Sequence, residues 1–356
     1  MRKENIVKNL LFALVLLLSF NVSVIAGESE GKVNTKSKVK EYIDHHLQDS
    51  YDFTFYSDGE TGEHFGFSLP IILIHDGFKV FSSSKFNHET TVAEVDGNFY
   101  KAYHGKIFIT DEAGTITKDE NGKVTNEKPL DFSITKNVFS MLLASIILLL
   151  MFTKLAKSYK KGAIPTGFGR VLEPLVIYVR DDIAIPNIGA KKHRKFMGFL
   201  LTVFFFIWVL NLMGMTPLGV NVTGNIAVTA CLALFTYLIT QFSANKDYWK
   251  HIFWMPGVPV LMKIVLIPIE LLGTLTKPFA LMVRLFANIT AGHVVIMSLI
   301  AMIFIGKNIA VDAPISIFLT LFISVIELLV AFLQAYIFTM LSALFIGLAV
   351  EEHEHH

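Results

Sequence analysis

Charge is scarce in this chain, and cysteine is almost absent. Only 17% of the 356 residues are charged, whereas 53% are hydrophobic, and a soluble domain carries about a quarter charged residues. The single cysteine, Cys231, excludes a disulfide framework and a metal site built from several cysteines. The sequence also lacks the G-x-x-x-x-G-K-[ST] loop that cradles nucleotide phosphates. The composition therefore predicts a membrane protein that binds no nucleotide.

The first 26 residues have the pattern of a secretory signal peptide. A basic start is followed by the apolar core "LLFALVLLLSF" and by small residues that permit cleavage after Ala26. An uncleaved anchor is the weaker interpretation, because the core has about a dozen residues and a membrane span needs about 20. Cleavage would place the mature N-terminus outside the cytoplasm.

Residues 27–136 predict a small β-rich module on the extracytoplasmic side. Asp96-Gly97 and Asn121-Gly122 stand between alternating apolar and polar residues, which is typical of β-hairpins. The stretch at residues 37–53 is compatible with a short helix.

Residues 137–356 predict an all-α polytopic membrane domain. We expect its helices at residues 138–153, 196–215, 225–243, 258–305 and 315–350. The connector from Lys154 to Lys195 holds ten Lys/Arg and three acids, so the positive-inside rule places it in the cytoplasm. Its middle, residues 168–185, is amphipathic enough to lie along the membrane surface. This orientation leaves the C-terminus cytoplasmic and agrees with a cleaved signal peptide.

The last two apolar segments are too long for upright crossings. As helices, residues 258–305 and 315–350 would reach about 70 and 54 Å, against a hydrocarbon core of about 30 Å. We favour two strongly tilted helices in an antiparallel hairpin around "GKNIAVDAP". Four shorter re-entrant pieces are the alternative, since Pro268, Gly273 and Pro278 could break the first segment.

Polar side chains share one face of each long segment. Those of the first recur at intervals of seven residues, with an amide four residues beyond: Glu270, Lys277, Arg284 and Asn288. On the second segment, Glu327 and Gln334 are also seven residues apart. A hairpin folded about Ile309–Ala310 brings His293 level with Glu327, and Arg284 level with Gln334.

These side chains suit the movement of protons through a membrane. His and Glu exchange protons near physiological pH, and such residues within a membrane mark proton relays. Arg284 keeps its proton, so it acts as a fixed charge that attracts a carboxylate and repels a proton. Its depth costs about 2.5–3.5 kcal/mol on insertion scales. No carboxylate of the chain sits clearly at its level, so we expect its partner on another chain.

Simpler structural roles remain open for single residues. Lys277 is as compatible with snorkelling to the cytoplasmic interface as with a function, and Glu270 could do no more than pair with it. His293 alone could be an interhelical hydrogen-bonding residue, and Gln334 alone could hold two helices together.

Two stretches resemble subunit a of the F-type ATP synthase: "LIPIELLGTLTKPFALMVRLFANITAGHVVIM" and "ELLVAFLQAYIFTMLSALFIGLAVEEH". The resemblance covers roughly residues 38–50 and 130–354, and the R-L-x-x-N-x-x-A-G-[EH] pattern is highly specific. It implies a bacterial inner-membrane subunit, one copy per complex, that forms two proton half-channels against the ring of c subunits and couples proton translocation to ring rotation and ATP synthesis. It implies b-type peripheral stalk subunits as further partners, and neither a nucleic acid nor a cofactor or metal.

The resemblance assigns roles to individual residues. Arg284 takes the place of the stator arginine that faces the ring carboxylate. Five further residues match the proton path of the family: His293, Glu327, Asn288, Gln334 and Glu270. The histidine precedes the acid here, as in mitochondrial members, whereas many bacterial members have the reverse order. Residues 51–129 have no counterpart in ordinary members, so the resemblance gives them no function.

Three other classes of protein fit the sequence less well. A self-contained secondary transporter commonly shows inverted repeats with broken helices, and no such repeat is evident. A receptor or scaffold that works through its exported module would tolerate replacement of Arg284, His293 and Glu327. An intramembrane hydrolase would need a Ser/Lys dyad, an Asp pair or an H-E-x-x-H motif.

Overall fold

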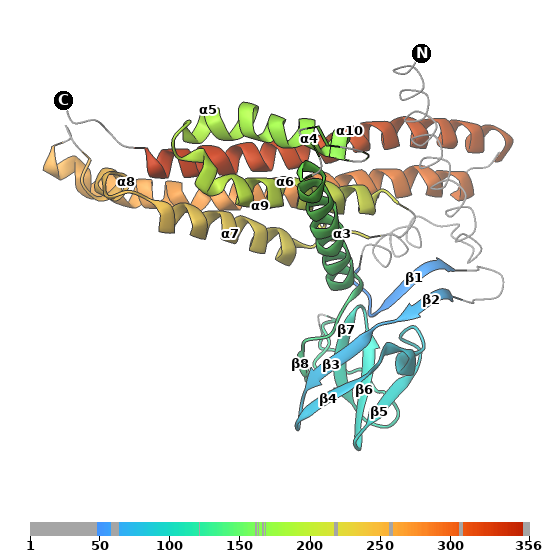
Figure 1. Ribbon diagram of the computed structural model, residues 1–356. Coiled ribbons are helices and arrows are strands. Elements are labelled where there is room, and N and C mark those ends of the chain that lie inside the picture. The colour runs from blue at the N-terminus through green and yellow to red at the C-terminus, as the bar shows by residue number, and fades with distance from the viewer. Residues whose placement is uncertain are drawn as a thin grey trace, which may run out of the picture. The chain divides into compact units, whose positions relative to one another are not determined.

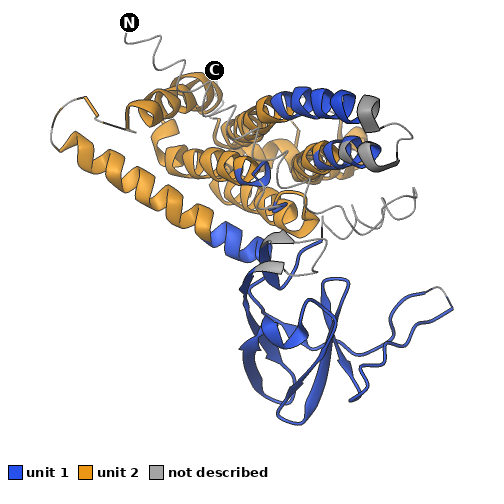
Figure 2. Ribbon diagram, turned by 90° about the vertical axis from the view of Figure 1, so that its right-hand side faces the viewer, with its two compact units in different colours: residues 1–142, 213–222, 293–326 blue, residues 143–212, 223–292, 327–356 orange. Residues whose placement is uncertain are grey.

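The computed structural model describes residues 48–57, 64–120, 122–160, 162, 164–165, 167, 169–216, 220–255, 259–305 and 309–351. These residues belong to two compact units (Figure 2). Unit 1 comprises residues 1–142, 213–222 and 293–326, and unit 2 comprises residues 143–212, 223–292 and 327–356. The expected signal peptide, and the expected short helix as far as residue 47, lie outside the described residues.

Unit 1 begins with a small β-rich module, as the turn signals predict (Figure 1). Its strands are β1 (Asp52–Ser57), β2 (His64–Ser68), β3 (Pro70–Ile74), β4 (Phe78–Ser82), β5 (Val92–Val95), β6 (Asn98–Tyr103), β7 (Lys106–Thr110) and β8 (Leu130–Asp131). They pair into the sheets β1-β2, β4-β3-β8 and β5-β6-β7. Side chains of the two larger sheets and their connections form one apolar core: Tyr51, Ile71, Leu73, Phe81, Phe86, Ala93, Tyr100, Ala102 and Ile107.

The turn chemistry of the module explains its hairpins. Asp96 and Gly97 join β5 to β6 and adopt φ of 51° and 76°, the left-handed values that a two-residue hairpin turn requires. Around Gly122, the strands are reduced to one bridge between Lys118 and Val124. The helix expected at residues 37–53 is wrong at its end, because residues from Asp52 onward pair with β2 as a strand.

The module is joined directly to the first long helix, α3 (Lys136–Tyr159). The amide of Lys136 donates to the carbonyl oxygen of Ser50 at 2.8 Å. One turn further, the ring of Phe139 meets those of Phe53 and Phe67, each at 5.3 Å between centroids. These contacts fix the module to the first turns of α3 through backbone and aromatic packing, with no flexible linker between them.

The remaining helices follow in chain order (Figure 1). They are α4 (Gly169–Tyr178), the π-helix η2 (Val179–Ala184), α5 (Ile185–Ile188), α6 (His193–Gly214), α7 (Ile226–Ser243), α8 (Lys246–Phe253), α9 (Val260–Ile305) and α10 (Ile309–Val350). Within the described residues, five helices are long and apolar enough to cross a membrane: α3, α6, α7, α9 and α10. The chain is therefore mostly helical, with a small β-rich region near its N-terminus.

Helices α9 and α10 are each continuous, and the alternative of four re-entrant pieces is wrong. They contain 46 and 42 residues, or about 69 and 63 Å at the α-helical rise. Pro268 and Pro278 lie inside α9 without ending it, because prolines within apolar helices are tolerated where neighbouring helices support the backbone. Helix α10 begins at Ile309 rather than at residue 315. Pro314 stands so near this start that it removes a single intrahelical hydrogen bond.

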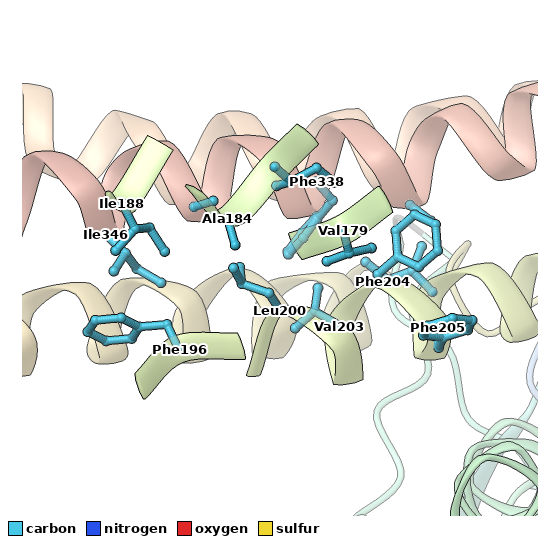
Figure 3. Packing of buried hydrophobic residues seen from close by; sticks show 14 of the residues in the cluster. Val179, Ala184, Ile188, Phe196, Leu200, Val203, Phe204, Phe205, Phe338 and Ile346 are labelled. Carbon is cyan, nitrogen blue, oxygen red and sulfur yellow. The ribbon is translucent and has the colours of Figure 1, made fainter. Parts of the chain in front are cut away.

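The core of unit 2 joins the basic connector to the membrane helices (Figure 3). Leu172, Val179 and Ile183, from α4 and η2, are almost fully buried and cluster with apolar residues of α6 and α10 such as Phe204 and Phe338. The connector thus buries one apolar side against protein, whereas Val171 and Ile177 stay exposed. Its expected position along the membrane surface stays a prediction.

The C-terminus of α10 is held by polar groups from two loops. Lys192 Nζ and Asn245 Nδ2 both donate to the carbonyl oxygen of Val350, at 2.7 and 2.8 Å. The backbone amide of Asn245 donates to the carbonyl oxygen of Ala349 at 2.8 Å. Carbonyl groups that have no partner within the helix are satisfied in this way, and the cation of Lys192 suits the negative end of the helix dipole.

Candidate functional site

The central feature of the candidate site is Arg284, an exposed arginine in the middle of α9. Its exposed neighbours on the same helical face carry small side chains or an amide: Ala280, Ala287, Asn288 and Ala291. Among the salt bridges of the described residues, none involves Arg284. Small side chains allow a helix of another chain to approach closely, so this face can present the guanidinium to a partner's carboxylate.

The predicted amide neighbours of Arg284 join α9 to α10. Asn288 Nδ2 donates to Gln334 Oε1 at 2.6 Å, and Gln334 is 1% exposed. The partner of Gln334 is thus Asn288, one helical turn beyond Arg284, and not Arg284 as the predicted hairpin suggested. The Gln334 Nε2 group is buried without a hydrogen-bond acceptor among the described residues. A buried N–H group without an acceptor costs free energy. The Nε2 group of Gln334 is therefore available to donate a hydrogen bond beside the face of Arg284.

Glu327 is buried in α10, with 6% of its surface exposed, and its carboxyl group approaches the backbone of α9. A Cβ atom added at Gly292 would lie 2.7 Å from Glu327 Oε1 and 3.2 Å from its Cδ. Ordinary contacts between non-bonded heavy atoms lie at about 3.5–4.0 Å. Only glycine at position 292 therefore leaves room for this carboxyl group.

Gly292 is a site residue that the sequence analysis missed. The available signal was a glycine inside a long helical pattern, which costs about 1 kcal/mol relative to alanine and so calls for a packing reason. The pattern itself does not tell which group approaches the glycine, because that group comes from another helix.

His293 is half-buried and also lies against a glycine, within unit 1. A Cβ atom at Gly214, the last residue of α6, would lie 3.5 Å from His293 Nε2 and 2.9 Å from the carbonyl oxygen of Val220. The close approach at position 214 is therefore that of the Val220 carbonyl oxygen, and the imidazole lies at an ordinary contact distance. Glu327 belongs to unit 2, and the expected pairing of His293 with Glu327 stays a prediction.

A second site residue that the sequence patterns did not single out is a polar one, Asn211 on α6. Asn211 is 2% exposed, donates through Nδ2 to the carbonyl oxygen of Ala331 at 3.3 Å, and accepts from Thr223 Oγ1 at 2.9 Å. Ala331 is one helical turn beyond Glu327. Asn211 therefore helps to fix the part of α10 that carries the buried carboxyl group.

A polar crevice lies among α7, α8, α9 and α10 in unit 2. Its volume is about 10 Å³, close to the space that one water molecule needs. Ten of the described residues line it, and seven of these carry a hydroxyl, amide or ammonium group: Thr236, Tyr237, Thr240, Gln241, Tyr248, Thr274 and Lys277. The Lys277 Nζ atom lies 5.5 Å from the ring centre of Phe345, so its charge is turned toward α10.

Glu270 lies near this crevice and is half-buried. Among the described residues, no salt bridge joins Glu270 to Lys277, so the simple ion pair allowed by the sequence is wrong. Burial raises the pKa of the Tyr248 phenol; a hydrogen bond with Gln241 lowers it, and electrostatic interactions with Tyr237 and Glu270 raise it further. The tyrosine therefore stays protonated at neutral pH and can donate or accept a hydrogen bond.

Comparison with known proteins gives two matches that divide the chain. Residues 138–347 match the family model described as ATP synthase A chain. Residues 42–132, which include most of the β-rich module, match a domain of unknown function (DUF8433). The first match covers more than half of the chain and includes all of α9 and nearly all of α10.

Curated relatives agree with the first match. The chain is 49% identical over 233 residues to ATP synthase subunit a of Chloroherpeton thalassium, covering 63% of this chain and 69% of that protein. It is 49% identical over 234 residues to ATP synthase subunit a 2 of Chlorobaculum tepidum, covering 64% and 66%. It is 45% identical over 233 residues to ATP synthase subunit a of Myxococcus xanthus, covering 64% and 76%.

Proposed function

Because this chain belongs to the ATP synthase subunit a family, we propose that it forms the two proton half-channels of an F-type ATP synthase. In this function it faces the ring of c subunits and couples proton translocation to rotation of the ring and to ATP synthesis. The observation that carries the proposal is Arg284, an exposed arginine in a membrane helix whose exposed neighbours are small. The chemistry of ATP itself belongs to other subunits of the complex.

Arg284 acts as the barrier between the half-channels. Its cation attracts the carboxylate of a passing c subunit and keeps it ionised, which releases the proton to the exit side. A guanidinium does not titrate in a protein, so it cannot itself carry a proton across. The cost of an arginine at this depth is offset when the ring carboxylate lies against it.

Protons enter past His293 and Glu327. Imidazole and carboxyl groups within a membrane form proton relays, and Gly292 leaves room for the Glu327 carboxyl group. The hydrogen bond between Asn288 and Gln334 fixes the spacing of α9 and α10 next to this path. Protons leave on the other side past Glu270 and the polar crevice at Lys277.

The family and the two long helices support a particular arrangement in the membrane. Helices of about 69 and 63 Å fit a hydrocarbon core of about 30 Å when they tilt by about 60–65° from the membrane normal, which lays a long face of α9 along the ring. The subunit is present once per complex in a bacterial inner membrane, beside b-type peripheral stalk subunits. The mature N-terminus and the β-rich module are outside, and the C-terminus is cytoplasmic.

Replacement of Arg284 by alanine tests this function. The complex is assembled in vesicles, and ATP-driven acidification and passive proton leak are recorded, with co-purification of the ring as the measure of assembly. We expect lost pumping with normal assembly, and a raised leak because the fixed charge is gone. Arg180→Ala is the matched control, since Arg180 is an exposed arginine paired with Asp181 outside the membrane-spanning helices.

Pumping near the wild-type level in Arg284→Ala would contradict the proposal. That result would favour a scaffold function through the β-rich module, which predicts that Arg284, His293 and Glu327 are all dispensable.

A further inference from the structure

An open cavity of about 340 Å³ lies between α3 and α4, and no residue named in the proposed proton path is among its lining. Of the residues that the structure describes, seven line it: Ile147, Leu150, Met151, Lys154, Leu155, Gly169 and Leu172. A volume of this size falls within the range of sites that bind small organic ligands. The cavity therefore has room for a ligand, and its lining decides which kind.

The two helices are held together beside the cavity by specific contacts. A Cβ atom at Gly169 would lie 3.1 Å from Leu155 Cδ1, so α4 approaches α3 as closely as a glycine allows. Tyr159 Oη also donates to Glu173 Oε1 at 2.7 Å. These contacts hold α3 and α4 together next to the cavity.

The lining is apolar along its length and cationic at one end. Apart from Lys154, every residue that lines the cavity has an apolar side chain or none. From Ile147 to Lys154, the cavity follows α3 over about 10 Å, or roughly a third of the hydrocarbon core. Leu150 is 50% exposed, so the wall opens toward the surroundings of the helix. This arrangement matches an acyl chain below a negatively charged head group.

The charges around Lys154 favour an anionic head group. Lys157 lies in the last turn of α3, Lys160 directly follows α3, and Arg170 is the second residue of α4; all three are exposed. Between residues 143 and 178 the only acidic residue is Glu173, which is already bonded to Tyr159. Clusters of basic residues next to a membrane helix attract anionic lipids.

The size of the cavity argues against a helix of a partner protein. A helix with side chains is about 10–12 Å across, so a 10 Å length of it occupies roughly 800 Å³, more than twice the space available. Free phosphate would use only the lysine and leave the apolar wall open. We propose that this cavity binds one anionic phospholipid, with an acyl chain along Ile147–Met151 and its phosphate at Lys154.

The test uses the whole chain in its purified complex, stripped of lipid by mild detergent. Phosphatidylglycerol or phosphatidylcholine is added, and bound lipid is counted by native mass spectrometry. Lys154→Gln is expected to weaken phosphatidylglycerol binding about five-fold and to remove the preference over phosphatidylcholine. Ile147→Trp fills the cavity and is expected to weaken both lipids.

Two variants serve as controls. Lys246→Gln removes an exposed lysine of α8 that neither lines the cavity nor belongs to the basic residues beside Lys154. Leu149→Trp enlarges a side chain of α3 that is 66% exposed and does not line the cavity. Neither control should change the count of bound lipid. Equal thermal midpoints for all variants would show that the fold is intact.

Three results would overturn the proposal. Unchanged phosphatidylglycerol binding in both Lys154→Gln and Ile147→Trp would mean that the lipid binds elsewhere. Displacement of the lipid by inorganic phosphate alone would reduce the site to an anion site. Loss of a protein subunit from the Ile147→Trp complex, with lipid retained, would identify the cavity as a protein interface.

Discussion

Replacement of Gly292 by alanine separates the stability of the membrane domain from its proposed proton transport. The added Cβ would lie 2.7 Å from Glu327 Oε1, so the carboxyl group must move by about 1 Å to reach an ordinary contact distance. The obstructed atom is at the end of a flexible side chain, and a rotation away from its preferred rotamer costs about 0.5–1.5 kcal/mol.

The two contributions to stability have opposite signs and similar size. Alanine in place of glycine stabilises a helix interior by about 0.8–1.0 kcal/mol, which offsets the rotamer cost. We therefore expect the free energy of unfolding of Gly292→Ala to stay within about 1 kcal/mol of the wild type. Proton transfer depends on distance much more steeply, since a misplacement of about 1 Å can lower a rate about 100-fold. Pumping should thus fall at least about ten-fold in a complex that still assembles.

The assay is ATP-driven acidification of vesicles, together with the thermal midpoint of the purified complex. Gly273→Ala is the matched control on α9, because no atom lies within 4 Å of its added Cβ, and it should pump normally. Wild-type pumping by Gly292→Ala would refute the reasoning, since the position of the Glu327 carboxyl group would then be unimportant. A large loss of stability would refute it as well, by showing that the side chain cannot move.

Two further predictions concern the contacts that hold α10. Denaturant unfolding of Asn288→Leu, Gln334→Leu and the double variant should give a coupling energy of about 0.6–1.7 kcal/mol, as for other hydrogen bonds between membrane helices. Additive effects on the free energy of unfolding would exclude this hydrogen bond. Lys192→Ala and Asn245→Ala should each lower the free energy of unfolding by about 0.5–1.5 kcal/mol. Their combination should lower it by more than the sum, because both donate to the carbonyl oxygen of Val350 and only the double variant removes both of these donors. A fully additive thermal shift would contradict this shared cap.

The fold was largely predictable because its signals are local. Apolar length alone predicts all five membrane helices, and the Asp96-Gly97 pair predicts the β5–β6 turn. The start of α10 was misplaced, because a proline near a helix start leaves the preceding residues free to be helical. The protein contacts of the connector containing Leu172 were not predictable, because an amphipathic pattern shows that one side is buried without showing whether lipid or protein covers it.

The sequence by itself determined the class of protein and the family, and it put the polar residues of α9 and α10 on common faces. These properties depend on composition, on helical period and on short motifs, all of which are written along the chain. Only the tertiary structure decided that Asn288 is the partner of Gln334, that Gly292 makes room for Glu327, and that α3 and α4 enclose a cavity beside Lys154. Such pairings depend on how far one helix slides along another. A shift of one turn, about 5.4 Å, exchanges every partner while leaving the pattern of each helix unchanged.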